Sequence, residues 1–119
     1  MDESKKKELV DAGVNVDAAL ERFMGNDKLL MRFLLKFAQD TNYTRLLDAM
    51  EKEDYKDAFE AAHALKGLSG NLSMDDLYKA ADRTTECLRH EKHEEAKACM
   101  PELQKEYERV SKVVGTLEG

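Results

Sequence analysis

Apolar residues recur at steps of three and four positions along most of the chain, which is the spacing of an α-helix with one buried side. The pattern is strongest between about residues 26 and 52, where it predicts one long helix with a bend at the polar run QDTNYT. The apolar positions of this segment are Leu30, Phe33, Leu34, Phe37, Thr44 and Leu47. No segment shows the strict alternation of a β-strand.

The remaining segments predict further helices. Residues 4–13 and 15–25 predict two short helices that end at glycines, the second with Asn15 as its N-cap. A long helix follows over about residues 54–72, and Ser73 is a candidate cap for the next one, whose apolar stripe runs over residues 74–88. The last helix contains Pro101, which predicts a kink or a late start there, because proline lacks an N–H donor.

The four long amphipathic segments and the short loops between them predict a fold. We expect an all-α domain, an antiparallel up-down four-helix bundle with the short N-terminal helices at one end. A length of 119 residues fits one domain spanning residues 1–119. Glycine and proline are scarce, which agrees with a helical protein.

The charge and the cysteine content narrow the function classes. A net charge of −6 argues against nucleic acid or an anionic membrane as the main partner. The two cysteines are too few for a disulfide framework, which favours a reducing compartment. The N-terminus lacks the apolar core of a signal peptide, and the most apolar run, LLMRFLLKFA, is too short and too charged to span a membrane. We expect a cytoplasmic, monomeric protein.

The stretch AAHALKGLSG, residues 61–70, is unusual for a helix, because each of its two glycines costs about 1 kcal/mol relative to alanine. At 100° per residue, His63 lies opposite the apolar side of this helix and points to solvent. Lys66 and Gly67 lie one turn beyond His63, Gly70 lies two turns beyond, and Phe59 lies one turn before. The apolar side opposite His63 consists of Ala61, Leu65, Leu68 and Leu72.

This exposed side has the groups that phosphoryl chemistry needs. An imidazole with a free nitrogen is a competent nucleophile, and a nearby ammonium stabilises a phosphoryl group bound to it. The glycines remove side chains beside the ring, so a bulky partner can approach it. From the residues alone, a phosphoacceptor and an ordinary surface histidine both remain open interpretations of His63.

The motif AHALKGLSGNLSM, residues 62–74, resembles the core motif of histidine-containing phosphotransfer (HPt) domains, and the segment GVNVDAALERFMGNDKLLMRFLLKFAQD is similar to their lead-in to the bundle. The resemblance implies a four-helix bundle that passes a phosphoryl group between aspartates of receiver domains. It implies that His63 accepts the group, Lys66 neutralises its charge and Gly67 gives the receiver room. Phe59 and Gly70 are further docking candidates from the helix geometry.

Two positions depart from the family pattern. Ser73 stands where the family often has a glycine, ten residues after the histidine. Thr85 falls near the position where many members have a glutamine that hydrogen-bonds to the imidazole. Thr85 is therefore a candidate site residue with two open alternatives: its hydroxyl orients the ring, or the contact is missing in this chain.

The partners and cofactors follow from the same resemblance. Response-regulator receiver domains or a hybrid histidine kinase are the expected partners, and Mg²⁺ is expected on the receiver, with no cofactor bound by this chain. The sequence has no phosphate-binding glycine loop and no kinase signature. We therefore expect a phosphocarrier without ATP-dependent kinase activity.

Two other functions are compatible with the sequence. A metal site is one, because potential ligands lie close together in the sequence. These are Cys87, His90, His93, Glu94 and Cys99. The other is a non-catalytic helical adaptor that only binds protein partners, which phosphorylation of His63 would distinguish from a phosphocarrier.

Overall fold

The computed structural model describes residues 1–117, which form helices and no β-strand, so the predicted all-α class is confirmed. A single antiparallel bridge between Val14 and Met74 is the one β-type pairing within residues 1–117. The helices are α1 (Glu3–Asp11), α2 (Val16–Arg22), α3 (Asp27–Phe37), α4 (Asn42–Glu51), α5 (Tyr55–Asn71), α6 (Asp75–Arg89) and α7 (His93–Gly115).

The two short N-terminal helices form as the sequence predicts, although α1 ends at Asp11 and α2 at Arg22, shortly before the expected stops at Gly13 and Gly25. The side chain of Asn15 accepts a hydrogen bond from the Ala18 backbone N–H at 3.1 Å, which caps the start of α2. Gly13 and Gly25 follow α1 and α2 with φ of +91° and +76°. These left-handed conformations are strained for residues with a side chain, so glycine is the favourable choice there.

The long helix predicted over residues 26–52 is two helices, α3 and α4, separated by residues 38–41. The break has a local cause, because the Asp40 carboxylate accepts hydrogen bonds from the backbone and side-chain amides of Asn42, at 2.9 and 2.8 Å. A side chain that bonds the backbone two residues on competes with continued helix. The break lets α3 pack against α2 and α7 while α4 packs against α5.

The late start expected at Pro101 and the cap expected at Ser73 are both wrong. Helix α7 begins at His93 and runs through Pro101 to Gly115, so Pro101 does not delay its start. Ser73 does not cap α6 with its side chain, and its backbone has a φ of +53° in the turn before that helix. A left-handed residue favours glycine, which gives a physical reason for the family's preference at this position.

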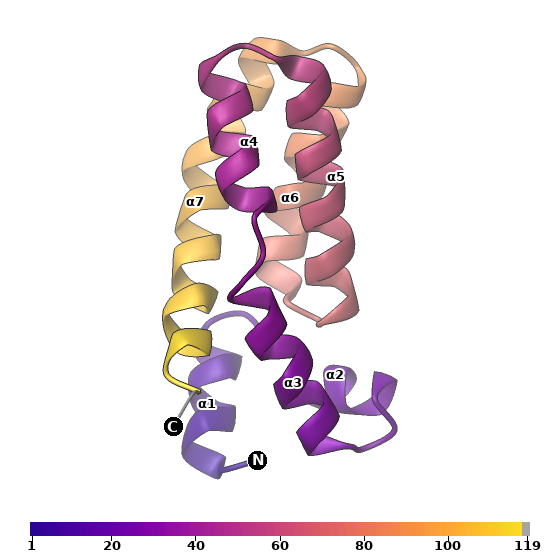
Figure 1. The fold of residues 1–119 in the computed structure, drawn as a ribbon, viewed down its shortest axis with the longest axis vertical. Coiled ribbons are helices and arrows are strands. Elements are labelled where there is room, and N and C mark those ends of the chain that lie inside the picture. Colours follow the sequence, from indigo (N-terminus) through magenta and orange to yellow (C-terminus); the bar gives the residue numbers. More distant parts are fainter. Residues whose placement is uncertain (118–119) are drawn as a thin grey trace.

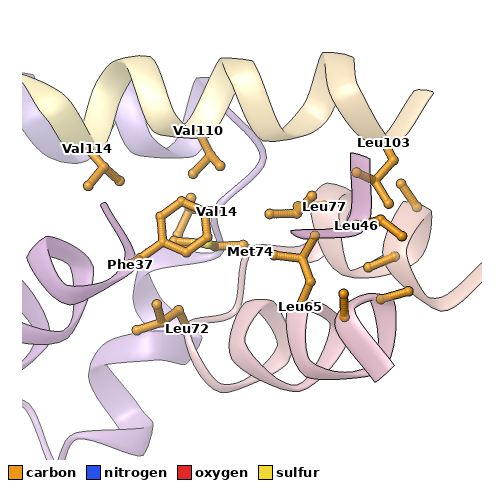
Figure 2. Close-up of a cluster of buried hydrophobic side chains, with 14 of the residues drawn as sticks. Val14, Phe37, Leu46, Leu65, Leu72, Met74, Leu77, Leu103, Val110 and Val114 are labelled. Carbon is orange, nitrogen blue, oxygen red and sulfur yellow. The ribbon is translucent and has the colours of Figure 1, made fainter. Parts of the chain in front are cut away.

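Helices α4 to α7 each pack against the next one in the chain, and neighbours run in opposite directions (Figure 1). Helices α1, α2 and α3 gather at one end of this group, where α1 and α3 also contact α7. Buried apolar side chains from both parts form a continuous core (Figure 2). Its largest fully buried members include Phe37, Leu46, Leu65, Leu72, Met74, Leu77, Leu103 and Val110.

The segment between α1 and α2 is fastened to the turn between α5 and α6. The Asn15 N–H donates to the Ser73 carbonyl at 2.8 Å, and the Asp76 N–H donates to the Gly13 carbonyl at 3.4 Å. These bonds place the N-terminal helices against the C-terminal end of α5, the helix that carries His63.

Replacing Gly13 by alanine tests this attachment. A Cβ at Gly13 would lie 2.9 Å from the Cβ of Asp76, whereas a Cβ at Gly25 would meet nothing within 4 Å. We expect Gly25→Ala to lower the free energy of unfolding by about 1 kcal/mol through backbone strain alone. Gly13→Ala should cost about 1–3 kcal/mol more, because atoms of the turn must shift. Urea denaturation measures both, and equal losses would contradict the close approach.

Candidate functional site

His63 lies near the middle of α5 and is exposed to solvent, as the helix geometry predicts. The opposite side of the helix holds it in place, because Ala61, Ala62 and Leu65 are fully buried. The imidazole stacks on the ring of Phe59 one turn earlier, with 5.8 Å between ring centroids and 25° between the planes. The ring is therefore supported on one side and accessible on the other.

A surface cavity of about 490 Å³ lies beside the imidazole, along the C-terminal half of α5. It is lined by residues of three helices, so the tertiary fold creates it. These are Arg22 from α2, His63, Lys66, Gly67, Gly70 and Asn71 from α5, and Asp75 and Tyr78 from α6. The cavity thus joins a nucleophile, two cations and one carboxylate in a space larger than a phosphoryl group.

Lys66 lies in the cavity wall but is already paired. Its Nζ is 2.9 Å from Oδ1 of Asp82 on α6, and its side chain is 23% exposed. The hydrogen bond to Asp82 is the main cause that raises the pKa of Lys66, and the charge of Asp82 adds to it. The ammonium is therefore charged at neutral pH and stands next to the carboxylate of a neighbouring helix.

The two glycines of the motif have different surroundings. A Cβ added at Gly67 would meet nothing within 4 Å, so the surface beside His63 is open there. A Cβ at Gly70 would lie 3.2 Å from Cδ2 of Tyr78, whose ring packs over this glycine from α6. Gly67 therefore leaves space on the outside, whereas Gly70 makes room for a side chain of the same molecule. Gly70 lines the cavity but is a weaker docking candidate than the helix geometry predicts.

Phe59 is half-buried and continues the surface on the other side of His63. The guanidinium of Arg89 lies over its ring, 5.0 Å from the centroid. A second cavity of about 370 Å³ lies here, and Lys56 and His93 also line it. The exposed side of α5 is therefore flanked by aromatic and basic groups, although the whole chain is acidic.

Of the two alternatives for Thr85, the structure supports the missing contact with the imidazole. Thr85 is fully buried, and its hydroxyl donates to the carbonyl of Ala81 in its own helix at 2.7 Å. A hydroxyl is too short to reach from the buried side of α6 to the exposed side of α5. In this structure the His63 ring is instead held by stacking on the ring of Phe59.

The sequence alone did not identify three residues near His63 as part of the site: Arg22, Tyr78 and Asp82. Tyr78 and Asp82 are four residues apart, which places them on one side of α6, but the periodicity of α6 does not say which helix borders that side. Arg22 reaches the cavity only because the N-terminal helices dock against the end of α5.

Two further observations concern the other function classes. Within residues 1–117, no three His, Cys, Asp or Glu side chains are grouped closely enough to hold a metal ion. His93 instead stacks on Tyr55, with 3.7 Å between ring centroids, and Cys87 and Cys99 are free thiols. None of the helices described is both long and apolar enough to cross a membrane.

Comparison with known families places this site in context. The family model described as the Hpt domain matches residues 31–113, well over half of the chain, and the match includes His63, Lys66 and Gly67. No match is found among curated proteins or among solved structures. Hpt domains are phosphotransfer modules of phosphorelays, phosphocarriers rather than kinases, and they work with receiver domains or histidine kinases. From the match over residues 31–113, the chain belongs to the Hpt domain family.

Proposed function

We propose that this protein is a histidine phosphotransfer protein of a multistep phosphorelay, which shuttles a phosphoryl group between receiver aspartates through His63 on a four-helix, up-down bundle. One observation carries the proposal: an exposed imidazole on α5 stands beside open backbone at Gly67 and a cavity that Lys66 lines. These are the features that a nucleophile needs if its substrate is attached to another folded domain.

The transfer step is an in-line displacement at phosphorus. The lone pair of a neutral ring nitrogen of His63 attacks, a nitrogen–phosphorus bond forms, and the bond from phosphorus to the aspartyl oxygen breaks. The aspartate leaves as a carboxylate, and the proton on the other ring nitrogen passes to solvent or is kept. The reverse sequence delivers the group to a second receiver. The protein contributes mainly position and charge stabilisation.

The cations of the cavity support this role. Lys66 and Arg22 both line it, and neither sits deep in the core, so each can respond to a new anion. Within residues 1–117, Arg22 forms no ion pair, and Lys66 pairs with Asp82 alone. A phosphoryl group on His63 would gain charge-assisted hydrogen bonds from such partners.

The receiver and this chain supply different parts of the proposed transfer reaction. The receiver supplies Mg²⁺ and the acidic pocket, while this chain presents the nucleophile, binds no cofactor of its own and has no ATP-dependent kinase activity. The docking face comprises the exposed side of α5 around His63 and Phe59 and the adjoining edge of α6. We propose a monomer in the cytoplasm, and the two free thiols are compatible with a reducing compartment.

Replacing His63 by glutamine tests the nucleophile. Glutamine keeps a polar side chain on the exposed side of α5 but lacks the ring nitrogen, so transfer from a phosphorylated receiver should fall to background. The measurement is incorporation of labelled phosphate, with circular dichroism to show that helix content is unchanged.

His90→Gln is the matched control, since His90 is an exposed histidine at the C-terminal end of α6, outside the cavity. It should accept phosphate at the rate of the unmodified protein. Undiminished labelling of the His63→Gln protein would show that the phosphoacceptor lies elsewhere. Normal receiver binding without any labelling of the unmodified protein would instead indicate an adaptor.

Gly67→Gln tests steric access to the imidazole. A side chain fits at Gly67 without a clash inside the protein, so we expect the stability to be kept or raised by up to about 1 kcal/mol. The same side chain would stand in the path of a docking receiver and should slow transfer at least about tenfold, as misplacement of reacting groups does.

The control is Gly115→Gln, at a helical glycine that is also open and does not line the cavity. In Gly67→Gln, phosphorylation of His63 by the small donor phosphoramidate, which needs little space, should be slowed far less than transfer from the receiver. If transfer from the receiver keeps its normal rate in Gly67→Gln, the glycine has no steric role.

A further inference from the structure

Lys66 on α5 forms an ion pair with a carboxylate of α6, and the proposed transfer step does not use this carboxylate. Asp82 projects from α6 and contacts the Lys66 ammonium at 2.9 Å. Asp82 is 42% exposed, and within residues 1–117 it has no other ion pair. Neither side chain belongs to the buried apolar core, so the packing of the core does not require this pair.

The pair is also easy to exchange. Ion pairs between partly exposed side chains are held weakly, since water competes for both charges. Lysine has a flexible stem whose ammonium can move by several ångströms through rotation of its side-chain bonds. Gly67, the next residue, adds no side chain to restrict that movement, and the Lys66 side chain already lines the same cavity as His63.

A phosphoryl group on His63 changes the balance of charge around Lys66. It carries close to two negative charges and three acceptor oxygens, whereas the Asp82 carboxylate carries one charge. Lys66 is therefore drawn toward the phosphoryl group. Asp82 opposes this in two ways, because it holds the ammonium and because its own charge repels the phosphoryl group.

We propose that Asp82 is a positioning residue that competes with the phosphoryl group on His63 for the ammonium of Lys66. In the unphosphorylated protein it holds Lys66 on the α6 side. In the phosphorylated protein it limits how strongly Lys66 stabilises the phosphohistidine, so that the group remains transferable to the next receiver. This inference rests on the proposed function of His63.

Competition between Asp82 and the phosphoryl group for Lys66 would help a protein that must both accept and release that group. A shuttle must accept and release the same group, so a phosphohistidine that is bound too tightly would slow the onward step. An ammonium with a built-in competing carboxylate lowers the stability of the loaded state without removing the cation from the site. Lys66 and Asp82 together thus set the free energy of the loaded carrier between those of its donor and acceptor.

The test compares Asp82→Asn, Lys66→Ala and the double variant with the unmodified protein. Each is labelled by a phosphorylated receiver and separately by phosphoramidate, in which ammonia leaves as the nitrogen–phosphorus bond to His63 forms. The readouts are the equilibrium ratio of phosphohistidine to phosphorylated receiver and the hydrolysis half-life of the isolated phosphohistidine. A change in packing alone would alter unfolding but would not shift this ratio in a Lys66-dependent way.

Asp82→Asn should raise the equilibrium ratio and the half-life by about two- to fivefold, the range that one partly exposed ion pair supports. In the Lys66→Ala background the same substitution should change them by less than about 1.5-fold, because the competition is gone. Asp82→Glu keeps the carboxylate, so its equilibrium ratio and half-life should equal those of the unmodified protein. Asp48→Asn, which breaks a similar pair with Lys52 on α4 at 3.0 Å, should have no effect.

Unchanged or lowered values in Asp82→Asn overturn the inference, and so does an equal rise with and without Lys66, since Asp82 would then act by direct repulsion alone. These failures differ from failure of the proposed function. If the unmodified protein takes no phosphate on His63 from either donor, the proposed function falls and this inference falls with it. If it takes phosphate normally and Asp82 has no effect, only the role of Asp82 is wrong.

Discussion

The site depends on the burial of a narrow, alanine-rich side of α5. Ala58, Ala61 and Ala62 are fully buried, and their small side chains let α4 and α6 pack closely against this helix. Because an α-helix turns 100° per residue, fixing that side inward leaves His63 outward. The exposure of the proposed nucleophile is therefore a consequence of core packing, and no local feature of the imidazole is needed to produce it.

Close packing around α5 also explains why the motif tolerates glycine. A helix held by tertiary contacts on its buried side does not depend on the propensity of each exposed residue. The cost of about 1 kcal/mol at each of Gly67 and Gly70 is thus small compared with the burial of the core. Gly67 uses this tolerance to leave the surface open, and Gly70 uses it to seat the ring of Tyr78.

The charged side chains of the site lie where neighbouring helices meet. The chain is acidic as a whole, yet cations gather where α2, α5 and α6 meet. Lys66 lines the cavity beside His63 and also forms the ion pair with Asp82 across the boundary between α5 and α6. A charged side chain at such a boundary interacts with groups on both sides, which is why we propose that the Lys66–Asp82 pair adjusts the stability of a phosphorylated His63.

Much of the fold and the centre of the site were predictable, because they rest on periodicity along single helices. The outward direction of His63, the stop signals at Gly13 and Gly25 and the cap at Asn15 are local properties. The break between α3 and α4 was harder to predict, since it depends on a competition between helix continuation and the bonds of Asp40 to Asn42. The expected role of Thr85 was inferred by analogy with a longer side chain and failed because a hydroxyl bonds within its own helix.

The amino-acid sequence by itself determined the helical class, the motif around His63 and which side of its helix faces water, because each follows from interactions between residues a few positions apart. Only the tertiary structure decided that Asp82 pairs with Lys66, that Tyr78 covers Gly70 and that Arg22 reaches the cavity. Those contacts join different helices, and their choice depends on how the helices are rotated and docked against one another. The periodicity of one helix contains no information about the side chains that a neighbouring helix places at its edge.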